Sequence, residues 1–325
     1  MDRMHPMVKL TLLLAGMLLT GAAAEPQTRP ATTQAAKPVP YERGTITATL
    51  EQTAIDESSG IATSRRHADL LWTHNDSGDA PRLFALDRRG RHVGTYLLRG
   101  ARHVDWEDMA SAILDGVPTL IVADVGDNNS RRPRVRLYLT TEPDPRAPED
   151  SGETFRVRRT ITFTYADGPR DCEAVAVDPT GAAVYLIDKH RWSPCGVYRL
   201  SLAAPATQPA AAPVAERIAT LGYGMVTAMD ISPDGRRAIV GTYGDAFEYT
   251  RRPDEPWADA FARTPRRIRL PRRRQGEALG YGSDGVTLYA TSEKTPTPLI
   301  EIKPAVTEDN GTATTEPARG GKSVR

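Results

Sequence analysis

One phrase recurs along this chain and constrains its fold more than any other feature. In its clearest copy, 171–188, an acidic opening leads into a short apolar run, an Asp-Pro-Thr-Gly turn, and a second apolar run that ends at a charge. Short apolar runs between Pro, Gly and Asp turns are typical of buried strands rather than helices. The phrase therefore predicts an antiparallel hairpin.

Further copies of this hairpin occur at 57–73, 105–124, 226–242 and 275–291. Equivalent residues in successive copies are separated by 50, 66, 54 and 50 positions, and the residues aligned in this way are Glu57, Glu107, Glu173, Thr227 and Glu277. Repeats of this length that are built from short strands indicate a solenoid or a propeller.

Each hairpin is followed by sequence that can supply a third and a fourth strand, except that the last copy ends at 299–302 without a fourth. The segment 45–50 can complete it from the N-terminal side, which would close the ring and remove exposed sheet edges. We therefore predict an all-β fold, a β-propeller of four-stranded blades closed by the N-terminal strand. Five blades are predicted, and six are the alternative because the repeat of 66 residues is long.

The two ends of the chain differ from its centre in composition. A basic start, an apolar run at 10–19 and small residues at 22–24 predict a signal peptide over 1–24, and hence a periplasmic or secreted protein with no membrane span after signal removal. Residues rich in Pro, Ala and Thr predict a disordered linker over 25–43, and a similar tail is expected over 304–325. The propeller domain is predicted to occupy 44–303.

Charge and cysteine content narrow the function further. The chain has 42 basic and 41 acidic residues, so its net charge gives no reason to expect nucleic acid as a partner. We expect a monomer whose binding partner is a small anionic molecule or an envelope protein. Cys172 and Cys195, the only two cysteines, fall at the same end of the third blade. A disulfide between them is predicted for an exported protein, and two free, partly buried thiols are the alternative.

Acidic residues gather at one face of the predicted ring. The first strand of a blade begins, and its antiparallel second strand ends, on the same face, where equivalent glutamates would repel one another unless protonated, hydrogen-bonded or bound to a cation. Oxygen ligands favour Ca²⁺, with Mg²⁺ or another divalent cation as the alternative. Each glutamate could instead cap strand ends or pair with an arginine. The predicted metal ligands are Glu57, Glu107, Glu173, Glu277 and Asp124.

Basic residues precede the acidic opening in three copies, and an arginine beside a metal suits an anionic, oxygen-rich substrate. The predicted substrate-binding residues are Arg102, His103, Arg170 and Arg274, although they could simply neutralise the neighbouring carboxylates. The motifs of serine hydrolases, zinc proteases and P-loop proteins are missing from the sequence. Catalysis would then need water activated by the cation, with Glu107, Glu173 or His74 as the general base.

At the phrases 57–62, 72–79, 105–108, 124–128 and 275–278, the chain resembles uncharacterised secreted bacterial β-propeller proteins. More distantly it is similar to the phytase-like and gluconolactonase-like propellers, whose metal sits at the axial end of the channel. This resemblance implies a metal-dependent hydrolase of an anionic ester or lactone, of phosphoesterase or lactonase type. No catalytic residue transfers from either family position by position. The alternative is a non-catalytic propeller that binds a ligand or protein and holds a structural metal.

Overall fold

The computed structural model describes residues 35–147, 154–192, 194–203 and 212–306. These residues form strands and a single short helix, which confirms the all-β prediction. The predicted signal peptide and nearly all of the predicted C-terminal tail lie outside the described residues. No helix in the described part of the chain is long and apolar enough to cross a membrane.

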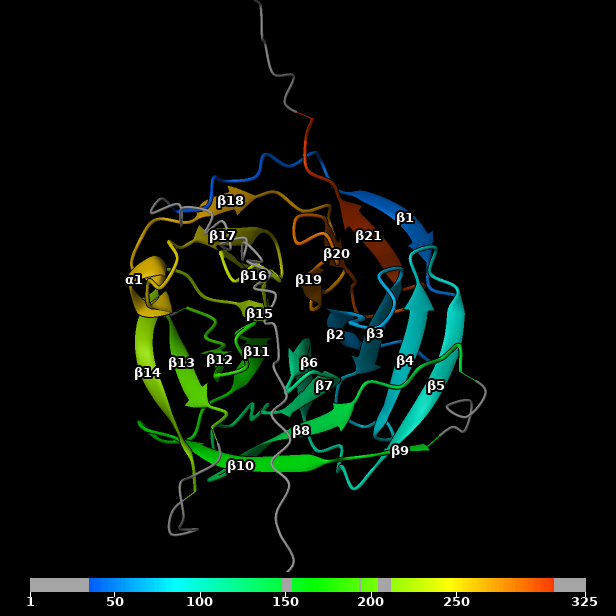
Figure 1. Cartoon of the computed structure of the whole chain (residues 1–325), viewed down its shortest axis with the longest axis horizontal. Coiled ribbons are helices and arrows are strands. Elements are labelled where there is room, and N and C mark those ends of the chain that lie inside the picture. The colour runs from blue at the N-terminus through cyan, green and yellow to red at the C-terminus, as the bar shows by residue number, and fades with distance from the viewer. Residues whose placement is uncertain (1–34, 148–153, 193, 204–211, 307–325) are drawn as a thin grey trace, which may run out of the picture. The chain divides into compact units, whose positions relative to one another are not determined.

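The first strand of each hairpin is the innermost of its sheet. These strands are almost wholly buried, as expected for apolar runs covered on both faces. They are β2 (Ser58–Thr63), β6 (Trp106–Leu114), β11 (Cys172–Val177), β15 (Val226–Ile231) and β19 (Leu279–Tyr281). They pack against one another in the closed order β2, β6, β11, β15, β19 and back to β2, around the centre of Figure 1.

The second and third strands follow in antiparallel order. The second strands are β3 (Leu70–Asn75), β7 (Val117–Asp124), β12 (Ala183–Asp188), β16 (Arg237–Thr242) and β20 (Leu288–Ala290). The third strands are β4 (Arg82–Asp87), β8 (Val135–Thr141), β13 (Cys195–Ser201), β17 (Ala246–Thr250) and β21 (Pro298–Ile302). Four of the five turns between first and second strands contain a glycine at positive φ, namely Gly116, Gly181, Gly235 and Gly285.

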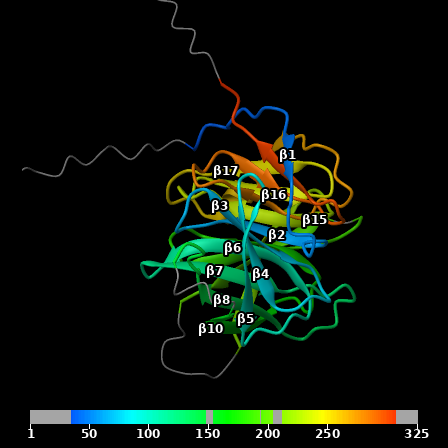
Figure 2. The same cartoon turned by 90° about the vertical axis from the view of Figure 1, so that its right-hand side faces the viewer.

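The outer strands are more exposed. They are β5 (His92–Arg99), β10 (Arg159–Tyr165), β14 (Val214–Leu221), β18 (Arg266–Ile268) and β1 (Thr45–Thr49). Figure 1 places β4 and β5 farther from the centre of the ring than β2, and Figure 2 shows this sheet from its outer side. The mixed exposure of β5 and β14 reflects strands with one face on the core and the other in water.

Hydrogen bonds join these strands into four sheets, which contain four, eight, four and five strands. The eight-stranded sheet consists of β6-β7-β8-β10 and β11-β12-β13-β14, which are joined where β10 and β14 pair in parallel at Thr164 and Tyr165. The five-stranded sheet gains β9 (Thr154–Arg156), which pairs in parallel with β5. The sheets are therefore not five separate units of four strands each.

The predicted pairing of the N-terminal strand with the last sheet is confirmed. Strand β1 runs antiparallel to β21, with Thr45 opposite Glu301 and Thr49 opposite Pro298. Just before it, Tyr41 forms a bridge to Pro304, and its hydroxyl donates a hydrogen bond to Glu248 at 2.9 Å. The described end of the predicted linker thus lies against the sheets.

The core is divided among the contacts between neighbouring sheets. Separate apolar clusters fill the successive spaces around the ring, for example Trp72 and Trp106 between the sheets of β2 and β6. Helix α1 (Trp257–Phe261) lies between β17 and β18 and buries Trp257, Ala260 and Phe261. Their spacing of three and four residues places them on one helix face, which packs on β14 and β17.

Candidate metal centre

A β-bulge interrupts the start of the inner strand in four of the repeats. The pairing register between first and second strands shifts from Trp106 to Asp108, from Cys172 to Ala174, from Val226 to Ala228 and from Ser58 to Gly60. A bulge leaves one extra residue unpaired and re-aims its side chain. The extra residues are Glu107, Glu173, Thr227 and Ser59.

The bulges bring acidic side chains from neighbouring strands together. Carboxylate oxygens of Asp76, Asp105 and Glu107 lie within 4.8 Å of one another, and so do those of Glu107, Asp171 and Glu173. Glu107 belongs to both groups. Oxygens on opposite sides of one Ca²⁺ ion are about 4.8 Å apart, since each lies about 2.4 Å from the ion. Either group therefore fits one divalent cation.

Glu107 is the most constrained member of this acidic mouth, the name used here for Asp76, Asp105, Glu107, Asp171 and Glu173. Its side chain is buried, and no hydrogen bond or ion pair from the described residues reaches its carboxylate. Burial raises the pKa of Glu107 well above its usual range, and the charges of Glu173, Asp76 and Asp105 raise it further. Gly126 permits this arrangement, because a Cβ there would collide with the Glu107 and Asp105 carboxylates.

A lysine from the end of β12 supplies the one close positive charge described at Glu173. The Nζ of Lys189 lies 2.6 Å from Oε1 of Glu173 and 5.2 Å from the ring centroid of Tyr243. Burial raises the pKa of Glu173 to about 8, although the Lys189 ammonium opposes the shift. The mouth thus keeps an excess of acidic groups over cations.

Other carboxyl groups around the acidic mouth also have raised pKa values. Burial raises the pKa of Asp105 to about 6, with a further contribution from Asp76, and that of Glu293 to about 7, with a further contribution from Glu277. Burial and the neighbouring Glu57 raise the pKa of Asp76. These shifts have the common cause expected of crowded carboxylates without a bound cation.

Glu57 is not the equivalent of Glu107, so the alignment of the first repeat was wrong by two residues. The carbonyl of Glu57 accepts from Asp76 N–H, as that of Asp171 accepts from Lys189 N–H, so Glu57 corresponds to Asp171 and Ser59 to Glu173. The Glu57 side chain is 41% exposed and pairs with Lys294 at 3.2 Å. It lies outside both groups of clustered oxygens.

Asp124 and Glu277 also stand apart from these groups. Asp124 is buried in an ion pair with Arg132 at 2.7 Å, and its Oδ1 accepts the Asp105 N–H at 3.2 Å. Oε1 of Glu277 accepts from Gln275 at 3.0 Å, and its buried Oε2 has no partner among the described residues. Glu277 is close enough to Glu173 to raise its pKa.

His74 lies in the core and not at the acidic mouth. Its side chain is fully buried against Trp106, with ring centroids 5.5 Å apart, and Nδ1 lies 2.8 Å from the Asn75 carbonyl oxygen. Burial lowers the pKa of His74 to about 4, so the ring is neutral near pH 7. Its Nε2 has no hydrogen-bond partner among the described residues, and His74 belongs to neither group of clustered oxygens, so its role as a general base stays a prediction.

The predicted substrate-binding residues are scattered. Arg102 is exposed, His103 stacks on Trp106 with ring centroids 4.4 Å apart, and Arg170 pairs with Asp167 at 2.9 Å. Arg274 is also exposed and donates to the Thr295 carbonyl at 3.1 Å. The neighbouring Arg273 turns inward instead, donates to the Thr242 carbonyl at 3.0 Å, and feels the charge of Glu277.

The predicted disulfide is absent, because Cys172 and Cys195 are both free and buried in the structure. Cys172 lies on β11 and Cys195 on β13, and β12 runs between them. Two strand spacings are about 9.5 Å, which exceeds the Cα separation of about 7 Å that a disulfide can span. The alternative of two buried thiols describes this structure.

Three members of the acidic mouth, Asp76, Asp105 and Asp171, were not predicted as ligands, and neither was Lys189 as their counter-charge. Asp105 and Asp171 each stand two residues before a bulged glutamate. In a regular strand, residues two apart point to the same side, so this Asp-x-Glu spacing was the available signal. Asp76 follows β3, the second strand of the preceding repeat, and the spacing within one repeat does not show that it lies beside Glu107.

Comparison with known proteins gives structural likenesses only. No family model matches the chain, and no curated protein matches its sequence. A gluconolactonase from Xanthomonas campestris is 10% identical with a TM-score of 0.45, covering 83% of this chain and 99% of that one. A candidate 6-phosphogluconolactonase from Bacteroides uniformis is 16% identical with a TM-score of 0.39, covering 81% and 71%.

The Dos1 propeller is 10% identical with a TM-score of 0.34, covering 75% of this chain and 67% of that one. The similar structures thus include a propeller and two proteins named as lactonases, the kinds of protein that the sequence resembles at a distance.

Proposed function

We propose that the acidic mouth binds a divalent cation, Ca²⁺ in the first place, and that the protein is a metal-dependent hydrolase of an anionic ester or lactone. The observation that carries the proposal is the position of Glu107. Its carboxylate is buried, receives no hydrogen bond from the described residues, and belongs to both groups of clustered oxygens. A buried carboxylate without a partner is costly unless it is protonated or meets a cation.

The donor set supports a hard cation. Asp76, Asp105, Glu107, Asp171 and Glu173 offer only carboxylate oxygens, and the described residues around them bring neither a thiolate nor an imidazole into the two groups. Such ligands suit Ca²⁺, Mg²⁺ or Mn²⁺ rather than zinc or copper. Glu107 and Glu173 would hold the ion, with Asp76, Asp105 and Asp171 completing the set from either side.

The reaction class follows from the charges at the same mouth. A bound divalent cation would polarise the carbonyl or phosphoryl oxygen of a substrate. Lys189, the exposed Lys294 and the inward Arg273 provide positive charge for an anionic group of that substrate.

The proposal also includes the number of blades and the export of the protein. The ring of inner strands, the outer strands and the closing β1 support five four-stranded blades, with the β10–β14 and β5–β9 pairings as additions between neighbours. The basic, apolar and small-residue pattern of 1–24 supports export to the periplasm or the medium. We expect the exported domain to act as a monomer on a small anionic molecule.

A calcium titration by calorimetry tests the cation site. We expect saturable binding to the chelator-treated protein, and a loss of affinity of about tenfold or more in Glu107→Gln, which removes one charged ligand. Glu216→Gln, an exposed outer-strand carboxylate, is the matched control and should bind like the parent. Equal affinity in Glu107→Gln and the parent would refute the site.

A second experiment separates an enzyme from a binding protein. Lactones and phosphate esters are supplied to the protein with calcium and with chelator, and hydrolysis is followed by proton release. Turnover that needs the cation and falls in Glu107→Gln supports the hydrolase. Calcium binding without any such turnover would assign the cation a structural role in a ligand- or protein-binding propeller.

A further inference from the structure

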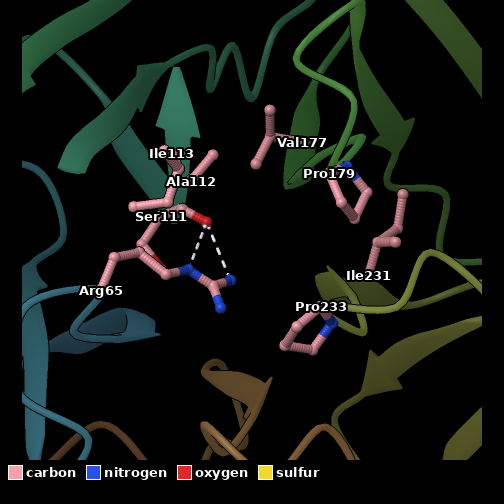
Figure 3. A pocket seen from close by; sticks show the side chains of 8 residues that line it. All are labelled: Arg65, Ser111, Ala112, Ile113, Val177, Pro179, Ile231 and Pro233. Carbon is pink, nitrogen blue, oxygen red and sulfur yellow. Dashed lines mark hydrogen bonds between the residues drawn. The ribbon is translucent and has the colours of Figure 1, made fainter. Parts of the chain in front are cut away.

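A cavity of about 130 Å³ lies at the opposite end of the inner strands from the acidic mouth. Figure 3 shows its lining, which comes from the ends of β6, β11 and β15 and from the turns that follow β2, β11 and β15. Six of its eight lining residues are apolar, among them Val177, Ile231 and Pro233, and Arg65 is the only charged one. Neither the proposed cation site nor the proposed reaction uses this cavity.

Arg65 is held in place with part of its guanidinium free. Its Nε and Nη2 both donate to the Ser111 carbonyl oxygen, at 3.1 and 2.9 Å, and its backbone N–H donates to Glu142 at 2.9 Å. The third nitrogen, Nη1, receives no partner from the described residues and points into the open space in Figure 3. Two fixed contacts pre-organise this donor, so little side-chain entropy remains to be lost on binding.

Burial raises the pKa of Asp230 and the charge of Arg65 partly offsets this rise, but Asp230 accepts hydrogen bonds from backbone N–H groups and not from Arg65. Asp230 is partly buried on β15, and its two oxygens accept the N–H groups of Ile231 and Tyr281, both at 2.8 Å. It has no ion pair with Arg65 among the described residues. The Arg65 guanidinium therefore keeps donor capacity for another anion.

We propose that this cavity binds a short-chain carboxylate, with the carboxylate on Nη1 of Arg65 and the hydrocarbon tail against the apolar wall. The volume sets the size, because a cavity of about 150 Å³ holds a molecule such as benzene with six heavy atoms. Acetate, propionate and butyrate have four to six heavy atoms, as their formulae give. The apolar wall disfavours phosphate or sulfate, whose remaining oxygens would lose their water without gaining donors.

Butyrate and its neutral isostere butyramide test the charge. We expect butyrate to bind at millimolar concentration in ligand-observed NMR and butyramide to bind about tenfold more weakly, because only butyrate forms a charge-assisted hydrogen bond with Arg65. Equal binding of the two, or no saturable binding of butyrate, would overturn the proposal.

Two variants place the ligand in this cavity. Arg65→Met should lose butyrate binding, whereas the exposed Arg89→Met should keep it. Because Arg65→Met also removes the contacts to Ser111, its folding is checked by a melting curve, and Ala112→Leu provides a second route by filling the cavity while leaving Arg65 intact. Unchanged butyrate binding in a folded Arg65→Met or in Ala112→Leu would contradict the assignment. Glu107→Gln should bind butyrate like the parent, which separates this site from the cation site.

Discussion

The Nζ of Lys189 lies 2.6 Å from the Glu173 carboxylate, so the acidic mouth contains its own cation. The Glu173 side chain is 4% exposed and that of Lys189 is 19% exposed, so water screens the pair only in part. A divalent cation on Glu173 must share this carboxylate with the ammonium. Lys189 is thus the counter-ion of Glu173 in the metal-free protein and would compete with the proposed cation.

Replacing Lys189 by Met should have opposite effects on folding and on binding. Without metal, the free energy of unfolding should fall by about 2 kcal/mol, since Glu173 stays buried without its partner. Calcium affinity should rise, because a competing positive charge has gone. Chemical denaturation in chelator and calcium titration measure the two effects.

Lys294 provides the control for this variant. It pairs with Glu57 and Glu293 at the same mouth, but its side chain is 50% exposed. Lys294→Met should therefore change stability by less than about 1 kcal/mol. A larger loss in Lys294→Met than in Lys189→Met would mean that the buried pair is not the important one.

The raised pKa values at the mouth predict how stability depends on pH. In the metal-free protein, Asp105 with a pKa of about 6 and Glu293 with a pKa of about 7 hold protons that the unfolded chain releases near pH 4. Between these values the folded state binds more protons than the unfolded state, so the free energy of unfolding decreases as pH rises from about 5 to 7.

Calcium should reverse this trend, because a cation favours the ionised carboxylates and binds more tightly as they lose protons. Melting curves at several pH values, in chelator and in calcium, provide the measurement. A melting temperature in chelator that rises steadily from pH 5 to pH 7 would contradict the assigned shifts.

Replacing Asp108, the residue after Glu107, should destabilise the fold strongly. Its Oδ1 accepts the Met109 N–H at 2.8 Å, and its Oδ2 accepts those of Val175 at 2.9 Å and Met229 at 3.2 Å, so it ties β6 to β11 and β15. Asp108→Ala should lower the free energy of unfolding by about 3 kcal/mol, because buried N–H groups lose their acceptor. Asp69→Ala, at an exposed ion pair, should change it by no more than about 0.5 kcal/mol.

The repeat explains why the fold was predictable. Each copy carries apolar runs, and four of the five also carry a turn glycine, which together specify a hairpin locally. The missing last strand could be matched to 45–50 because a closed ring needs it. The parallel contacts of β10 with β14 and of β5 with β9 were not predictable, because they join outer strands of different repeats. Nothing in the local pattern of Thr164 or Phe155 indicates such a partner.

The site was predicted less well, because bulges set its geometry. Counting residues aligned Glu57 with Glu107, whereas the hydrogen bonds align Ser59 with it. A two-residue slip keeps the alternation of a strand unchanged, so the sequence pattern fits both alignments equally. Burial is the second factor that the sequence does not reveal. Nothing in the sequence around His74 indicates that its ring is buried, and nothing distinguishes the inward Arg273 from the exposed Arg272 and Arg274 beside it.

The two thiols should behave as buried, reduced groups. Burial raises the pKa of Cys172 well above its usual range and also raises that of Cys195, so little reactive thiolate forms near neutral pH. We expect a thiol reagent to label neither cysteine quickly in the native protein and both after unfolding without reductant. Mass spectrometry counts the labels, and an unlabelled unfolded protein would reveal a disulfide after all.

The corrected alignment gives the last prediction, a comparison of two glutamates in the same assay. Glu57 is 41% exposed and pairs with Lys294, whereas Glu107 is 4% exposed and belongs to both groups of clustered oxygens. Glu57→Gln should lower calcium affinity by less than about threefold, since it alters only a screened charge. Glu107→Gln should lower it about tenfold or more. Calorimetry on both variants, each checked for an unchanged far-ultraviolet spectrum, makes the comparison. If the two variants lose affinity equally, the cation is attracted by the charge of the whole mouth rather than coordinated at the bulges, and the role given to Glu107 is wrong.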